Sequence, residues 1–205
     1  MSWLIGAYAV CAFAQILSVT IQRFKVAYWP LKAILGLLYL GMVQLEALDW
    51  KVAIIFLFYY LGDLVLGIPT MEARTKIQWG IGLFGTGHVI LGIDLAQQID
   101  AVMIGLLVGI LFFSFLGTVR YWIRTFNLEG LMWPVNAYVL ILMSVGVMGW
   151  MDASTTGYLS IGIMLFIISD GWLAAWHLMR KPKVFTKVLN ILFYYPALVL
   201  MIISL

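Results

Sequence analysis

Charged residues are scarce in this chain: lysine, arginine, aspartate and glutamate together make up only 10% of its 205 residues. Hydrophobic residues make up 64%, and the mean hydropathy is +1.06. A soluble domain carries about 25% charged residues, so this composition indicates a polytopic helical membrane protein. We expect a single transmembrane domain covering residues 1–205.

Residues that define many metal and cofactor sites are also rare. The only cysteine, Cys11, excludes an internal disulfide framework and a cysteine-based metal cluster. The two histidines, His88 and His177, lack HxxxH or HExxH spacing, so no metal site is expected. No glycine-rich phosphate motif follows a strand-like run. We therefore expect no cofactor and no nucleic-acid partner.

What the chain does contain is a series of apolar runs, each about as long as a helix that crosses a bilayer. The runs cover residues 2–21, 31–48, 50–68, 77–93, 101–119, 133–150, 159–179 and 184–205. They predict an all-α fold with eight transmembrane helices in one bundle. The connections are short, so consecutive helices should be antiparallel neighbours.

The distribution of positive charge predicts the orientation of these helices. All basic residues except Lys51 lie at or just beyond the ends of the first, third, fifth and seventh runs. By the positive-inside rule these ends are cytoplasmic, which places both termini outside the cytoplasm. Most acidic loop residues fall on the opposite side.

Two aspartates lie inside apolar runs, Asp63 in the third and Asp170 in the seventh. A charge at the centre of a bilayer costs roughly 2.5–3.5 kcal/mol on insertion scales, so an intramembrane carboxylate is neutralised, paired or used. At about 1.5 Å per residue, Asp63, Asp170 and His88 all fall between the midplane and the predicted cytoplasmic face. This clustering predicts a cavity that opens toward the inner leaflet.

Further polar side chains fall at a similar depth, or share the predicted Asp63 face of the third run, and are candidate substrate-binding residues. They are Tyr59, Tyr60, Asn136, Tyr138, Tyr194 and Tyr195. Each has a structural alternative, because tyrosines often only fill space and a buried aspartate or histidine can link two helices. Two carboxylates that lie close together in low dielectric would divide the roles of acid and base between them. Such a site suits hydrolysis of a lipid-soluble substrate.

At these residues the sequence resembles the YhhN family of membrane lysoplasmalogenases. The matching segments are Trp29-Pro30-Leu31-Lys32, Leu61-Gly62-Asp63-Leu64-Val65-Leu66, Gly82-Leu83-Phe84 with Gly87-His88, Ala137-Tyr138 through Met143, Leu165-Phe166-Ile167-Ile168-Ser169-Asp170 with Leu173-Ala174, and Tyr194-Tyr195. They follow the family order over nearly the whole chain. The sequence departs from the family pattern at Leu91 and at Pro196-Ala197-Leu198.

The resemblance implies hydrolysis of the vinyl ether bond of lysoplasmalogens, with Asp63 and Asp170 as the catalytic pair. The products would be a fatty aldehyde and glycerophosphoethanolamine or glycerophosphocholine. We assign the acid role to Asp170 and the base role to Asp63. The lysophospholipid phosphate could be held by basic residues at the predicted inner surface, which otherwise serve orientation alone. These residues are Arg74, Lys76, Arg120 and Arg124.

Three other function classes fit the same pattern. In a proton-coupled transporter the aspartates would relay protons, usually beside broken helices, for which only Pro69 and Pro196 offer a hint. Another acid-initiated lipid enzyme, such as a membrane terpene cyclase, would also protonate a double bond. A non-catalytic lipid-binding protein would bind the lipid without forming products. The sequence leaves headgroup preference, chain length and oligomeric state open.

Overall fold

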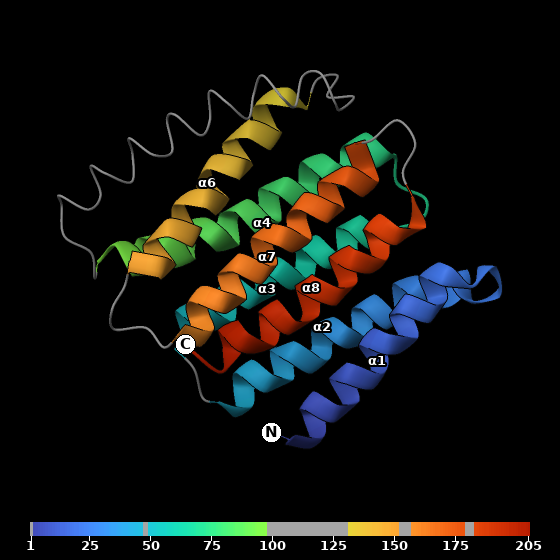
Figure 1. Cartoon of the computed structure of the whole chain (residues 1–205), viewed down its shortest axis with the longest axis horizontal. Coiled ribbons are helices and arrows are strands. Elements are labelled where there is room, and N and C mark those ends of the chain that lie inside the picture. The colour runs from blue at the N-terminus through green and yellow to red at the C-terminus, as the bar shows by residue number, and fades with distance from the viewer. Residues whose placement is uncertain (1, 47–48, 98–130, 152–156, 179–182) are drawn as a thin grey trace.

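The computed structural model describes residues 2–46, 49–97, 131–151, 157–178 and 183–205. In these residues the chain forms only helices (Figure 1). Their bounds are α1 Ser2–Thr20, the 3₁₀ helix η1 Gln22–Ala27, α2 Tyr28–Leu45, α3 Trp50–Gly67, α4 Ala73–Ala96, α6 Met132–Met151, α7 Gly157–Leu178 and α8 Val184–Ile202. The seven α-helices are long and apolar enough to cross a membrane. The predicted all-α, multi-pass class is confirmed.

The helix bounds follow the predicted apolar runs closely, with two informative differences. Helix α2 begins at Tyr28 instead of residue 31, because Pro30 fits the first turn of a helix, where its missing N–H is not needed. Helix α4 begins at Ala73 instead of residue 77, so Arg74 and Lys76 are helical. The predicted run 101–119 lies outside the described residues.

The described helices form a closed ring. Each helix packs against the next described helix in the chain, and α8 completes the ring by packing against α1. Helices α4 and α6 run in the same direction, since Ile77 clusters with Val135 near their starts and Gly92 faces Met148 near their ends. Both termini lie at one end of the bundle (Figure 1).

The opposite end of the bundle is formed by the last residues of α1, α3 and α7 and the first residues of α2, α4, α6 and α8. We call it the basic end, because most of the described basic residues lie there. These are Arg23, Lys25, Lys32, Arg74, Lys76, Lys183 and Lys187. The remaining described basic residue, Lys51, starts α3 at the other end, where it forms an ion pair with Asp94.

The outside of the ring is apolar, and polar side chains are buried inside. Val10, Phe13 and Leu37 expose 70%, 62% and 59% of their surface. The buried polar residues include Gln15, Lys32, Asp63, His88 and Asn136. Water would favour the reverse arrangement, whereas a lipid solvent accepts the apolar outer surface and makes internal polar contacts valuable. The distribution supports a membrane-embedded bundle.

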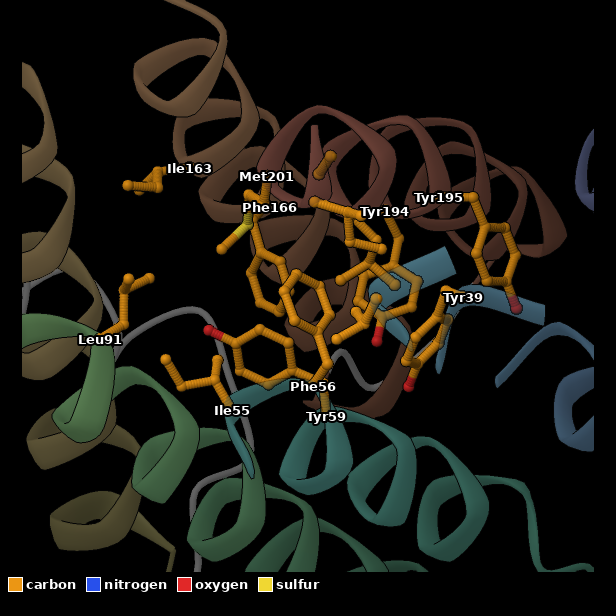
Figure 2. Packing of buried hydrophobic residues seen from close by; sticks show 14 of the residues in the cluster. Tyr39, Ile55, Phe56, Tyr59, Leu91, Ile163, Phe166, Tyr194, Tyr195 and Met201 are labelled. Atoms are coloured by element: carbon orange, nitrogen blue, oxygen red, sulfur yellow. The ribbon is translucent and has the colours of Figure 1, made fainter. Parts of the chain in front are cut away.

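Aromatic side chains fill the middle of the ring. Figure 2 shows Phe56 and Tyr59 of α3, Phe166 of α7 and Tyr194 of α8 converging at the centre. The ring centroids of Tyr59 and Phe166 lie 5.2 Å apart, and those of Phe166 and Tyr194 lie 5.3 Å apart. These tilted and edge-on contacts are the preferred geometries of aromatic pairs. The layer ties helices from opposite parts of the ring together and forms the floor beneath the two aspartates.

Candidate active site

Asp63 lies in the last turns of α3, where it forms an ion pair with Lys32 of α2. The ammonium Nζ of Lys32 is 2.6 Å from Asp63 Oδ1 and 3.2 Å from the Asp63 carbonyl oxygen. The hydroxyl of Tyr194, from α8, donates to Asp63 Oδ2 at 2.8 Å. Both charged side chains are buried. One cationic and one neutral donor satisfy an ionised carboxylate, which is the state that these contacts favour.

Asp170, on α7, has a different environment. The hydroxyl of Tyr138, on α6, donates to Asp170 Oδ2. Neither of the two ion pairs found among the described residues includes Asp170. No hydrogen bond joins Asp170 to Asp63, both of which are described residues, so the two carboxyls have separate partners. The two carboxyls therefore have different surroundings, and no direct contact that could share a proton joins them.

Two adjoining cavities meet at Asp170. The smaller has a volume of about 10 Å³, which is close to the minimum for one water molecule. Both aspartates border it, and the polar groups around it include Lys32 and Tyr194. Its complete lining is Lys32, Asp63, Leu66, Phe84, Asp170, Leu173, Asn190, Ile191, Tyr194 and Tyr195.

The larger cavity has a volume of about 210 Å³ and lies among α3, α4, α6 and α7. Most of its lining is aliphatic, with Tyr138, Asp170 and His177 as the polar exceptions apart from backbone. Leu66, Phe84, Asp170 and Leu173 border both cavities. An apolar space of this size suits part of a lipid, with His177 at one end and Asp170 one turn from Ile167 at the other.

Several of the remaining predicted site residues lie at the two cavities or in the aromatic layer beneath them. Tyr138, Tyr194 and Tyr195 border the two cavities. His88 and Tyr59 lie in the aromatic layer beneath them, with ring centroids 5.0 Å apart. His88 Nδ1 is 2.8 Å from the Phe84 carbonyl oxygen. Because a carbonyl only accepts, Nδ1 carries the proton and leaves Nε2 as an acceptor.

Other predicted residues do not reach the aspartates. Tyr60 packs over Gly36 of α2, and Asn136 is buried on α6, so neither borders the two cavities. Lys76 is half-buried beside the larger cavity, and Arg74 is exposed. Arg120 and Arg124 lie outside the described residues. The structure thus brings together both aspartates with three of the predicted tyrosines.

From its sequence position, Lys32 belongs to the basic residues that set orientation. The structure shows that its side chain also contacts Asp63 inside the bundle. It lies within α2, buried, in contact with Asp63. The available signal was a lysine inside an apolar run, combined with the need of a buried aspartate for a cation.

Asn190 is a second residue that the sequence reasoning missed. It borders the smaller cavity, and its amide donates to Ser169 Oγ at 2.8 Å and to the Ser169 carbonyl at 3.1 Å. These bonds join α8 to α7 directly beside Asp170 and so fix the position of that carboxyl along the bundle axis. A polar amide in the apolar run 184–205 was the signal that could have identified it.

The fold and site define a multi-pass helical membrane protein with a buried, charge-paired carboxylate and a second carboxylate at an apolar cavity. The family model of the YhhN family matches residues 22–205, which covers nearly the whole chain. The chain belongs to the YhhN family. No curated protein and no solved structure matches the chain significantly.

Proposed function

We propose that this protein hydrolyses the vinyl ether bond of lysoplasmalogens, forming a fatty aldehyde and glycerophosphoethanolamine or glycerophosphocholine. One observation carries the proposal. A cavity the size of one water is bordered by both Asp63 and Asp170, and it adjoins an apolar cavity that Asp170 also lines. Water, acid, base and an apolar chain can therefore meet at one point. Membership of the YhhN family supports the same reading.

In the first step Asp170, as a neutral acid, gives its proton to the β-carbon of the vinyl ether. The π electrons of the double bond form the new C–H bond, and the ether oxygen stabilises the resulting oxocarbenium ion. Asp170 suits this role because it borders the apolar cavity, where the chain would place the double bond. The negative charge of Asp63, across the smaller cavity, favours the cation as it forms.

In the second step water in the smaller cavity attacks the cation, and Asp63 accepts a proton from that water. Asp63 suits this role because Lys32 and Tyr194 favour its ionised form and its oxygens retain lone pairs for a further donor. The product is a hemiacetal. Asp170 then takes the hemiacetal hydroxyl proton, and Asp63 returns its proton to the departing glycerol oxygen. The C–O bond breaks, and both carboxyls regain their starting states.

Two features weigh against the alternative classes. Helix α8 runs through Pro196 without interruption, and Pro69 follows the end of α3, so neither proline breaks a described helix, whereas transporter sites usually lie beside broken helices. A terpene cyclase has to keep water from its carbocations, whereas here a water-sized space lies between the two carboxyls.

The test is to incubate purified protein with a lysoplasmalogen and measure fatty aldehyde. Asp63→Asn and Asp170→Asn should each lower the rate by at least about 100-fold, because an amide of the same size cannot perform the proton transfer. Asp94→Asn is the matched control, since Asp94 also pairs with a lysine, at 3.1 Å, but at the other end of the bundle. Its rate should match the wild type. Normal turnover by either site variant would refute the pair.

Isotope and analogue experiments test the chemistry itself. In heavy water the rate should fall, and the aldehyde should carry one solvent deuterium on the carbon next to its carbonyl. A plot of rate against pH should be bell-shaped, because one carboxyl must be protonated and the other ionised. A saturated alkyl-ether lysolipid should compete without being cleaved. Cleavage of that analogue at the vinyl ether rate would exclude protonation at carbon.

A further inference from the structure

The larger cavity extends from Asp170 toward the basic end along one face of α7. Ile167, Asp170, Ala174 and His177 all line it, at the spacing of one helix face. Asp170 and His177 are two turns apart, which is about 10 Å along the helix axis. His177 is next to the last residue of α7, so it marks the end of the cavity at the surface of the bundle.

Positive charge gathers around this end of the cavity. The positively charged side chains near the His177 ring are Lys187, Lys32 and Lys76. Lys187 in turn experiences the charges of Lys32, Lys76 and Lys25. Lys187, Lys32 and Lys76 come from α8, α2 and α4, so three helices place positive charge near His177.

Lys187 and Lys76 contribute excess positive charge beside the cavity. Lys32 is neutralised by Asp63. The two ion pairs among the described residues include neither Lys187 nor Lys76. Both lysines are half-buried, and Lys76 directly precedes Ile77, which lines the cavity. Like charges at close range cost free energy unless an anion joins them, so this arrangement favours a negatively charged ligand.

Lys187 is also held in place by aromatic rings. Its Nζ lies 3.6 Å from the ring centroid of Tyr28 and 5.2 Å from the ring of Trp176. An aromatic pair of this kind is the usual receptor for a choline-type ammonium, but here the lysine itself fills it. A lysine ammonium has three N–H donors, so those directed away from the rings can contact an anion.

We propose that Lys187, Lys76 and His177 bind the phosphate of a single-chain glycerophospholipid, and that this site does not select the headgroup amine. The glycerol of this lipid would lie in the larger cavity between Asp170 and His177, and its chain would continue past Asp170 along Ile167. The proposal rests on the proposed function, which places the reactive bond at Asp170. In such a lipid about seven bonds separate the protonated vinyl carbon from phosphorus, or about 8 Å at 1.2 Å per bond. A contact of about 3 Å then spans the distance from Asp170 to His177.

Binding of an uncleavable ligand tests this site apart from catalysis. The probe is a saturated alkyl-ether glycerophosphocholine, which displaces a fluorescent single-chain lipid from purified protein at a fixed lipid-to-detergent ratio. Lys187→Met should weaken it at least about tenfold, the scale of one charge-assisted hydrogen bond, and Lys187→Arg should restore most of the affinity. Lys183→Met, which removes an exposed lysine from the same end, should leave binding unchanged.

Wild-type protein alone gives a second measurement that does not depend on a variant folding. A chain-matched alkylglycerol without phosphate should bind at least about tenfold more weakly than the phospholipid. The phosphocholine and phosphoethanolamine forms should bind within about threefold of each other, because Lys187 fills the aromatic pair. Chainless glycerophosphocholine should compete poorly.

Three results would overturn the phosphate site: equal binding of alkylglycerol and phospholipid, an equal loss with Lys183→Met, or strong selection of one headgroup amine. Failure of the proposed function would be visible separately, as a protein that binds the ether phospholipid as described but releases no aldehyde from the vinyl ether.

Discussion

The ammonium of Lys32 and the carboxylate of Asp63 form a buried ion pair between α2 and α3. Their atoms are 2.6 Å apart, both side chains are buried, and Tyr194 occupies the second carboxylate oxygen. A buried pair of this kind gains little over apolar packing, but removing one partner leaves an uncompensated charge. Breaking the pair therefore has large consequences, and one of its members is the residue that we propose as the base.

Replacing Lys32 by methionine should destabilise the protein by about 3–5 kcal/mol, because Asp63 would remain buried without its cation. Adding Asp63→Asn to that variant should recover a large part of the loss. Lys51→Met is the control, since the Lys51–Asp94 pair is partly exposed and should contribute no more than about 1 kcal/mol. Thermal unfolding in detergent measures all four proteins. A similar small loss for Lys32→Met and Lys51→Met would contradict a buried ion pair.

Single residues differ in how far the sequence reveals them. Asp63 and Asp170 stand out because each is a carboxylate in an apolar run. Lys32 stands near the start of such a run, where orientation already explains a lysine, so its contact with α3 could not be inferred from its own helix. Which side chains pair across helices depends on how each helix is rotated about its own axis. Apolar composition does not determine that rotation when every side of a helix faces either lipid or core.

Helices α3 and α4 pack closely because glycine and aromatic residues face each other in both directions. A Cβ atom on Gly62 would lie 2.7 Å from the Phe84 ring, and one on Gly87 would lie 2.6 Å from the Tyr59 ring. Small residues of this kind let helix backbones approach within a membrane. The contact positions Tyr59 and Phe84 in the aromatic layer, directly beneath the aspartates.

Gly87→Ala should destabilise the bundle by about 1–3 kcal/mol, because the added methyl overlaps Tyr59 in a filled core. The backbone oxygen of Ile55, 3.3 Å from the same Cβ position, limits how far the helix can move away. Gly6→Ala provides the comparison, since no described atom lies within 4 Å of a Cβ there and alanine favours helix. Unfolding of both variants in one detergent would show the difference. Equal stability would mean that α3 and α4 separate freely.

Element boundaries were predicted well where an apolar run ends abruptly and less well where polar residues begin a helix. Trp50–Gly67 and Met132–Met151 agree with their runs to within a residue at each end. Helix α4 extends over Arg74 and Lys76, whose long side chains reach the surface from the first turn. Hydropathy reports the apolar part of a helix, whereas hydrogen bonding decides its full length.

The described helices form a ring in which chain order sets most neighbours. The short connections predict antiparallel pairs, and α2–α3 and α7–α8 follow that rule. Closure by α8 against α1, and the parallel contact of α4 with α6, join segments that are distant in sequence. These contacts depend on side-chain fit and could not be read from single helices. The same closure brings Tyr194 of α8 to Asp63 of α3.

The orientation of this ring is predicted from charge and can be measured by labelling. In a Cys11→Ala background, a cysteine that replaces exposed Ser2 should react with an impermeant thiol reagent in intact cells. A cysteine that replaces Lys183, at the basic end, should be protected until the membrane is opened. The reverse pattern would place the basic end outside the cytoplasm and move the proposed lipid entry to the other leaflet.

The Lys32–Asp63 pair also bears on how the chain enters the membrane during synthesis. Helices α2 and α3 follow one another and pack together, so the two charges can leave the ribosome within a single hairpin. Inserted one at a time, each helix would carry an unpaired charge, at a cost of roughly 2.5–3.5 kcal/mol at full depth. Inserted together, they present the lipid with a neutral unit. The Lys32–Asp63 contact thus needs only α2 and α3, and none of the helices that follow them in the chain.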